Sequence, residues 1–196
     1  MITNVENKLK FIELVDEMKN INRAMMLRNG REETNAEHSF HLAIMVLILL
    51  EDFPELDSLK TLKMALLHDI VEIFAGDTVI FDAKMEATKD EREQKAIIQL
   101  EEVLGKESFT PMREIIEEYM NRSSLESEFV HQIDKFQPIM QVVMQGGDSW
   151  HQYKIDKNKL IEKKYKQIDD KFGLMKILDI YFEKAEKGNM FYNEEK

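Results

Sequence analysis

The chain has 196 residues, with 38 acidic against 27 basic side chains and a formal net charge of −11. Hydrophobic residues make up 43% of it and charged residues 33%, which excludes a disordered or fibrous chain. The negative charge argues against duplex nucleic acid as a partner, because phosphate backbones bind to basic surfaces.

Cysteine is absent, so disulfides, thiolate catalysis and cysteine-type zinc sites are excluded. The first residues, MITNVENKLKF, lack the apolar run of a signal peptide. The most apolar segment, 42–50, is much shorter than the roughly 20 residues of a membrane-spanning helix. We therefore expect a cytoplasmic protein that does not enter a membrane.

Apolar residues recur at helical spacing from the start of the chain. The spacing predicts a first helix over 5–21, then a loop over 23–36. It predicts a second helix over 36–50 that is apolar nearly all round and therefore central. After Pro54, Asp57 or Ser58 can cap a third helix that runs to about residue 74.

Capping patterns divide the second half of the chain. Thr88-x-x-Glu91 predicts the start of a helix that Gly105 closes, and Thr110-Pro111 predicts the start of the next. Ser123-x-x-Glu126 precedes a long helix over 124–144, which Gly146-Gly147 ends. Amphipathic helices follow over 158–169 and 174–187.

Only 7 glycines and 3 prolines occur, so turns are few. These patterns predict an all-α fold with seven or eight helices. We expect one domain over residues 1–196, with a core over about 10–150 and C-terminal helices over 154–188.

Three of the predicted helices carry groups that can bind a metal. His68 and Asp69 close the apolar run Met64-Ala65-Leu66-Leu67, and Glu72 shares their helix face. A satisfied core histidine is the alternative for a single His-Asp pair. His38 and Asp134 repeat the pattern, each on a helix with an apolar face.

The chain resembles the HD-domain metal-dependent phosphohydrolases, and more narrowly the HD-domain 5′-nucleotidases. The resemblance rests, in this order, on Arg28-Asn29, Glu37-His38-Ser39, His68-Asp69-x-x-Glu72, Gly76-Asp77 and Asp134-Lys135. It covers about residues 10–150.

The resemblance implies one divalent cation with four protein ligands, His38, His68, Asp69 and Asp134. It also implies that Glu72 orients or deprotonates the attacking water, and that Asp77 acts near the sugar or leaving oxygen. A set of two nitrogen and two oxygen ligands suits Mn²⁺, Co²⁺, Fe²⁺, Ni²⁺ or Zn²⁺ better than Mg²⁺. The implied reaction is metal-dependent removal of the 5′-phosphate from nucleoside or deoxynucleoside monophosphates.

Three of the six arginines, Arg23, Arg28 and Arg31, lie close together just before Glu37-His38. A phosphate dianion needs such cations around its oxygens, although solvated loop charges are the alternative. The resemblance favours Arg23 as the phosphate contact, while Arg28 either binds substrate or holds the loop. Some similar nucleotidases carry an aromatic residue after that arginine, where this chain has Ala24, so the sugar preference stays open.

A helical interaction module with an incidental polar core remains open from the residues alone, and so do two other functional classes. One is an HD hydrolase of another small phosphoester or of a nucleoside triphosphate. The other is a nucleotide-binding or regulatory protein that retains the metal site without turnover. Proteins of the resembled family commonly pair through helices, so we also expect a homodimer.

Overall fold

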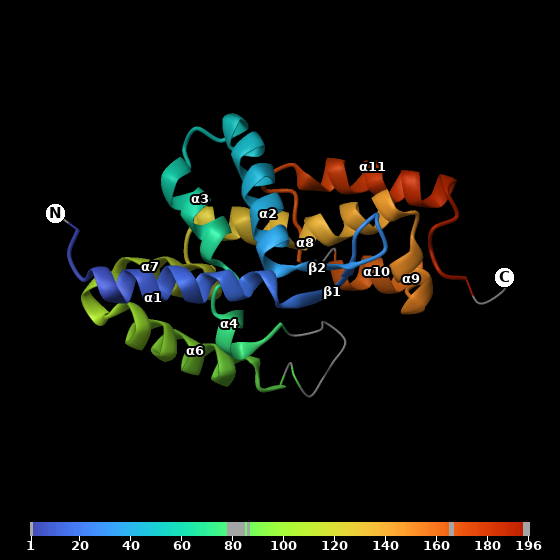
Figure 1. Ribbon diagram of the computed structural model, residues 1–196. Coiled ribbons are helices and arrows are strands. Elements are labelled where there is room, and N and C mark those ends of the chain that lie inside the picture. The colour runs from blue at the N-terminus through green and yellow to red at the C-terminus, as the bar shows by residue number, and fades with distance from the viewer. Residues whose placement is uncertain (1, 78–84, 86, 165–166, 194–196) are drawn as a thin grey trace. The chain divides into compact units, whose positions relative to one another are not determined.

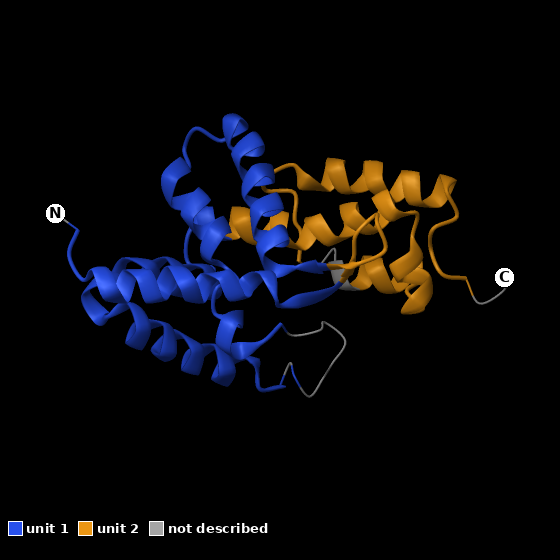
Figure 2. Cartoon of the chain, viewed as in Figure 1, with its two compact units in different colours: residues 1–24, 33–127 blue, residues 25–32, 128–196 orange. Residues whose placement is uncertain are grey.

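The computed structural model describes residues 2–77, 85, 87–164 and 167–193, and these are mostly helical (Figure 1). The predicted helical class is therefore confirmed. The chain forms two compact units (Figure 2), of which unit 1 comprises residues 1–24 and 33–127 and unit 2 comprises residues 25–32 and 128–196. No helix of the described residues has the length and hydropathy to cross a membrane.

Unit 1 contains the elements that carry most of the predicted site. Its helices are α1 (Val5–Val15), a 3-10 helix (Asp16–Lys19), α2 (Asn35–Leu49), a second 3-10 helix (Leu50–Asp52), α3 (Ser58–Leu67), α4 (Glu72–Ala75), α6 (Lys89–Leu104) and α7 (Lys106–Asn121). Unit 2 contains most of α8 (Leu125–Gln145), with α9 (Asp148–Gln152), α10 (Lys157–Lys164) and α11 (Leu174–Lys187).

The loop predicted over 23–36 is wrong, because this segment forms a two-stranded sheet. Strands β1 (Asn22–Met26) and β2 (Glu32–Thr34) pair with each other. The turn is closed by a 2.7 Å hydrogen bond from the Leu27 amide to the Arg31 carbonyl. Gly30 takes a positive φ of 81° there, and Asn29-Gly30 is a typical hairpin signal.

The helix predicted from 57 to about 74 is interrupted. Asp57 caps α3 by accepting a hydrogen bond from the Lys60 amide, as expected, but α3 ends at Leu67. A turn follows, and the separate short helix α4 begins at Glu72. His68 and Asp69 therefore lie at a break between two helices.

Several predicted caps and helix ends are also wrong, although α6 begins after Thr88 and ends before Gly105 as predicted. The Thr88 side chain makes no capping hydrogen bond at the start of α6. Helix α7 starts at Lys106, directly after Gly105, so Pro111 lies inside it. Ser124, not Ser123, caps α8 by accepting a hydrogen bond from the Ser127 amide. The sequence predicts that the first helix runs to residue 21, but α1 ends at Val15. The helix predicted over 158–169 corresponds to α10, which ends at Lys164.

The apolar composition of α2 predicts a helix that is buried on all sides, and this prediction is wrong. Leu42, Ala43 and Val46 are buried on one side of it. A second apolar stripe, Phe40, Ile44, Leu47 and Ile48, is exposed, with Phe40 at 67%. Composition alone cannot separate a buried helix from one with an uncovered apolar face.

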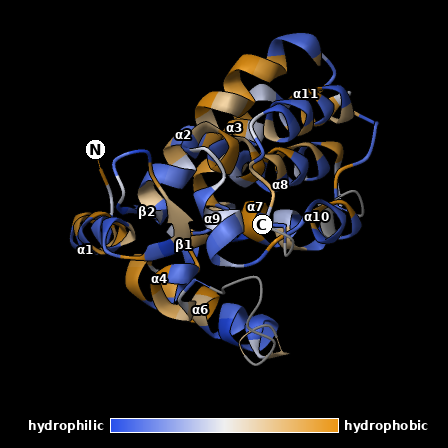
Figure 3. Ribbon diagram, turned by 90° about the vertical axis from the view of Figure 1, so that its right-hand side faces the viewer, coloured by the Kyte–Doolittle hydropathy of each residue, from blue (hydrophilic) through white to orange (hydrophobic). Residues whose placement is uncertain are grey.

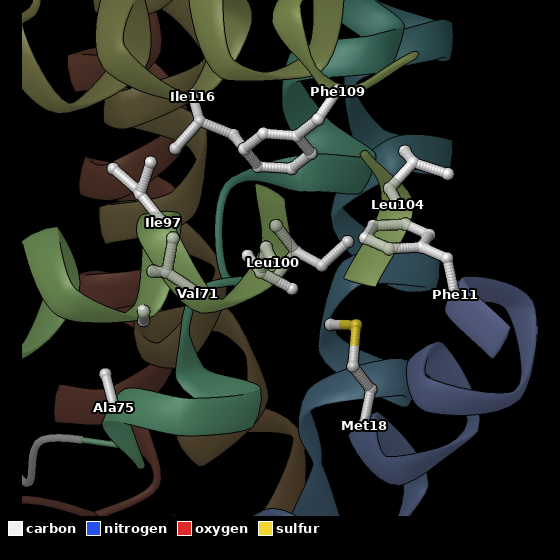
Figure 4. Close-up of a cluster of buried hydrophobic side chains, with 11 residues drawn as sticks. Phe11, Met18, Val71, Ala75, Ile97, Leu100, Leu104, Phe109 and Ile116 are labelled. Carbon is white, nitrogen blue, oxygen red and sulfur yellow. The ribbon is translucent and has the colours of Figure 1, made fainter. Parts of the chain in front are cut away.

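One hydrophobic cluster in unit 1 supports the segment that carries Asp69 and Glu72 (Figure 4). It comprises Phe11, Met18, Ile70, Val71, Ala75, Ala96, Ile97, Leu100, Leu104, Phe109 and Ile116. Because Ile70, Val71 and Ala75 are buried in it, the turn and α4 are fixed against α6 and α7. The polar side chains of the same turn are thereby held in place.

Unit 2 has an aromatic core of its own. Phe129 packs edge-on against Phe172 and Phe136 against Tyr181, while Trp150 stacks on Phe191. Figure 3 shows hydrophilic and hydrophobic residues on different sides of α11, whereas α10 is mostly hydrophilic. Helix α11 begins at Leu174 and ends at Lys187, as the sequence predicts.

Candidate metal centre and active site

Three predicted metal ligands of unit 1 come together. His38 lies on α2, and His68 and Asp69 lie in the turn after α3. His38 Nε2 is 3.1 Å from His68 Nε2, and Asp69 Oδ2 is 3.0 Å from His68 Nε2 and 3.7 Å from His38 Nε2. One ligand atom of each residue lies within 4.8 Å of the others.

The orientation of His68 leaves one nitrogen for the cluster. Its Nδ1 lies 2.9 Å from the Ala65 carbonyl oxygen, so Nδ1 carries the proton and donates it there. The ring edge also contacts Tyr119, with ring centroids 5.5 Å apart. Nε2 of His68 is then an acceptor facing a second imidazole nitrogen and a carboxylate. A shared cation satisfies that arrangement, so these residues fit a metal ion.

The local sequence explains the position of His38. Thr34 caps α2 by accepting a hydrogen bond from the Glu37 amide, and Glu37 accepts one from the Thr34 amide at 3.0 Å. This capping box fixes the first turn of the helix. His38 follows immediately and is fully buried. Glu37 thus shapes the site through the helix start.

Arg23 reaches the same cluster from strand β1. Its Nη1 donates a 2.7 Å hydrogen bond to Asp69 Oδ2, and its Nε lies 3.6 Å from Glu33 Oε2 on β2. The structure therefore places the predicted phosphate contact beside a predicted metal ligand. Glu33 is buried, and the sequence reasoning missed it because a charged residue in a charged run gives no periodic signal.

The charges around Asp69 keep it ionised. Burial acts to raise the pKa of Asp69. When His68 is protonated, its charge and its hydrogen bond, together with the charges of Arg23 and His38, hold the pKa of Asp69 well below its usual range. An ionised carboxylate is the form that binds a cation.

Glu72 begins α4 and is buried beside the cluster. Burial, and then the charges of Asp69 and Asp77, raise the pKa of Glu72 well above its usual value. Arg23 and a hydrogen bond from Asn35 oppose that rise. A carboxylate with a raised pKa is suited to accept a proton from water near neutral pH. The sequence reasoning did not single out Asn35.

Asp77 is half-buried, directly after the short helix α4 and Gly76. Its charge reaches Glu72, since it contributes to raising the pKa of that carboxyl group. Asp77 therefore lies near enough to Glu72 for the two charges to interact.

Two predicted site residues belong to unit 2 and are described within it. Asp134 is buried on α8 and accepts a 2.7 Å hydrogen bond from Lys135 Nζ. Pro138, four residues later, has no N–H for the Asp134 carbonyl, so the helix ladder is interrupted at this residue. Arg28 is exposed at the turn between β1 and β2.

Comparison with known protein families gives a match over most of the chain. Residues 15–176 match the family described as HD domain. The human protein named 5′-deoxynucleotidase HDDC2 is 31% identical over 135 residues, which are 68% of this chain and 65% of the human one. A fission yeast (Schizosaccharomyces pombe) protein named 5′-deoxynucleotidase hdd1 is 26% identical, over 67% of this chain and 69% of its own. The matched residues thus span slightly less than two thirds of the length of the human protein.

Solved structures agree with that match. The crystal structure of a predicted metal-dependent phosphohydrolase from Magnetospirillum magnetotacticum is 27% identical, with a TM-score of 0.84 over 97% of each chain. A conserved hypothetical protein from Pyrococcus furiosus is 26% identical, with a TM-score of 0.60 over 91% of this chain and 99% of its own.

Proposed function

This chain belongs to the HD-domain family, and from that premise we propose that it is a metal-dependent phosphohydrolase that removes the 5′-phosphate from nucleoside or deoxynucleoside monophosphates. The observation that carries the proposal is the convergence of His38, His68 and Asp69 beside the buried carboxylate of Glu72. The name 5′-deoxynucleotidase, which the human and fission yeast relatives bear, supports the substrate class.

We propose one divalent cation at this cluster, with Mn²⁺, Co²⁺, Fe²⁺, Ni²⁺ or Zn²⁺ favoured over Mg²⁺. Two imidazole nitrogens are the support for this choice, because Mg²⁺ prefers oxygen ligands. When bound, such a cation polarises a phosphoryl oxygen and makes a coordinated water more acidic. Asp134 is proposed as the fourth protein ligand. Two observations support this: the motifs follow each other along the sequence in the order of the resembled family, and Asp134 is buried on α8.

The protein's own residues divide the remaining work. Glu72 takes a proton from the attacking water, which its raised pKa allows near neutral pH. Arg23 is proposed to bind a phosphoryl oxygen, since its guanidinium already lies 2.7 Å from an anionic oxygen of Asp69. Asp77 is proposed to act near the sugar or leaving oxygen, and Arg28 to bind substrate from the hairpin turn.

The sugar preference is proposed to be relaxed. Ala24 follows Arg23 in β1 and offers only a methyl group where an aromatic ring would occupy space beside the sugar. A small side chain excludes a 2′-hydroxyl group less than a large one. Ribonucleoside and deoxyribonucleoside monophosphates are therefore both expected to be hydrolysed.

We further propose that the two units form one HD domain, that two chains pair as a homodimer, and that the protein acts in the cytoplasm. The family match from 15 to 176, which includes residues of both units, supports the first point. The exposed stripe of α2 supports the second, since large exposed apolar patches mark association surfaces.

Metal content tests the site directly. The purified protein should carry about one equivalent of transition metal by elemental analysis after reconstitution with Mn²⁺, and Asp69→Ala and Asp134→Ala should each lose most of it. Asp169→Asn is the control, because Asp169 accepts a hydrogen bond from Gln132 in unit 2 and has no proposed ligand role. Full metal occupancy in Asp69→Ala would overturn the proposed centre.

A further inference from the structure

Asn35 is the first residue of α2, and its side chain is completely buried. It does not cap the helix, because Thr34 does so. Its Nδ2 instead donates a hydrogen bond to Oε2 of Glu72, 37 residues further along the chain. Burying an amide is costly, and the bond from Nδ2 to Glu72 offsets part of that cost, whereas the buried Oδ1 of Asn35 has no hydrogen-bond partner in the described part of the chain.

Both ends of this contact are fixed by the backbone. The backbone N–H of Asn35 donates a 3.0 Å hydrogen bond to the Ile21 carbonyl, and the capping box of Thr34 and Glu37 fixes the same turn. On the other side, the Glu72 amide donates to the Asp69 carbonyl at 3.0 Å. The hydrogen bond therefore joins two rigid segments, one before His38 and one after Asp69.

The contact distinguishes the two oxygens of the Glu72 carboxylate. Oε2 is occupied by Asn35. Within the part of the chain that the structure describes, Oε1 accepts no hydrogen bond. A carboxylate held at one oxygen cannot rotate freely about its last bond, so the other oxygen keeps one direction.

From this geometry, and resting on the proposed function, we propose that Asn35 is a positioning residue that locks Oε2 of Glu72 and presents Oε1 as the oxygen that accepts the proton of the attacking water. The water's O–H bond breaks, its proton passes to Oε1, and its oxygen forms the new bond to phosphorus as the ester P–O bond breaks. The electron pair of the ester bond stays on the leaving 5′-oxygen, which takes up a proton from solvent and departs as the nucleoside hydroxyl. Asn35 touches neither the water nor the phosphate and acts only through Glu72.

A double-mutant cycle tests this role. Asn35→Leu keeps the approximate volume and removes the donor, and it should lower kcat by about 10- to 100-fold with little change in KM or in bound Mn²⁺. In a Glu72→Gln background, which is already slow, Asn35→Leu should change kcat by less than about twofold. Damage to the fold would lower kcat in both backgrounds, so equal losses in the two would overturn the proposal.

Two controls keep the result interpretable. Thr61→Val also removes a buried side-chain hydrogen bond from unit 1, that of Oγ1 to the Asp57 carbonyl, and it should lower stability without changing kcat. Asn35→Ala replaces the leucine variant if that variant does not fold. If Glu72→Gln is inactive while Asn35→Leu matches the unmodified enzyme, the positioning role fails alone. If the unmodified protein releases no phosphate, the proposed function fails instead.

Discussion

Arg23 lies between two carboxylates, with Nη1 2.7 Å from Asp69 and Nε 3.6 Å from Glu33. Glu33 holds the guanidinium on the hairpin side, and Asp69 receives the end that faces the metal cluster. Under the proposed function, a substrate phosphate would compete with Asp69 for the same donor, and Asp69 would then be left to a bound cation. The proposed role of Arg23 is therefore an exchange of one anionic partner for another when substrate binds.

Removing this arginine should weaken substrate use and leave the metal in place. Arg23→Ala is expected to lower kcat/KM by about 10- to 100-fold, the range for one hydrogen bond to a charged group. Steady-state kinetics with metal analysis checks this. Arg113→Ala is the matched control, because that arginine pairs with Glu101 and Glu117 on the outside of unit 1. An unchanged kcat/KM in Arg23→Ala would contradict a role for Arg23 in substrate binding.

Glu126 makes a pH-dependent contribution to stability. Burial acts to raise the pKa of Glu126, but backbone hydrogen bonds, including one from the Asp57 amide, and the Lys60 ammonium lower it overall. A lowered pKa means that the stabilisation is present above the ordinary value of about 4.3 and is lost as the pH falls below it.

Glu126→Gln should therefore cost about 1 kcal/mol of unfolding free energy at pH 7 and almost nothing near pH 3. Urea denaturation at the two pH values measures the difference. Glu91→Gln, in the exposed pair with Lys95, should leave the unfolding free energy unchanged at both. An equal loss from Glu126→Gln at pH 7 and pH 3 would contradict the lowered pKa.

The sequence identifies the residues that can do chemistry better than the residues that hold them. His38, His68 and Asp69 follow from their types and order, and the structure brings all three together. Glu33 and Asn35 could not be predicted in the same way. Their roles depend on contacts with residues 10 and 37 positions away, which no local pattern encodes.

At the level of elements, long helices were predictable and interruptions were not. Helix α11 has strong apolar periodicity and α2 has a long apolar run, and both helices lie close to where these patterns predict them. The hairpin of β1 and β2 carries mostly charged and polar residues, so its strands give no alternating pattern. The break after Leu67 is equally hidden, because tertiary packing of Ile70 and Val71 decides it.

The exposed apolar stripe of α2 allows a test of the proposed homodimer. If the exposed stripe Phe40, Ile44, Leu47 and Ile48 forms a dimer interface, Leu47→Lys combined with Ile48→Lys should convert dimer to monomer. Sedimentation velocity measures the change. Leu59→Lys, at an equally exposed leucine of α3, should leave the dimer intact. A monomeric unmodified protein would contradict the homodimer.

At the level of the whole molecule, a bound cation should stabilise the fold, since it binds the folded chain and not the unfolded one. Mn²⁺ at about 100 times its Kd is expected to add about 2.7 kcal/mol, or roughly 5–10 °C in Tm. Calorimetry before and after EDTA treatment measures the shift. Asp69→Ala should show no such rise, and an equal rise in that variant would place the stabilising ion elsewhere.

Phosphate release is the most direct test of the central claim. The assay compares deoxyribo- and ribonucleoside 5′-monophosphates, using EDTA-stripped protein resupplied with Mn²⁺, Co²⁺ or Mg²⁺. The account predicts release from both sugar classes, dependent on added metal and abolished in Asp69→Ala. Release from no monophosphate with any metal, or undiminished release in Asp69→Ala, would contradict it.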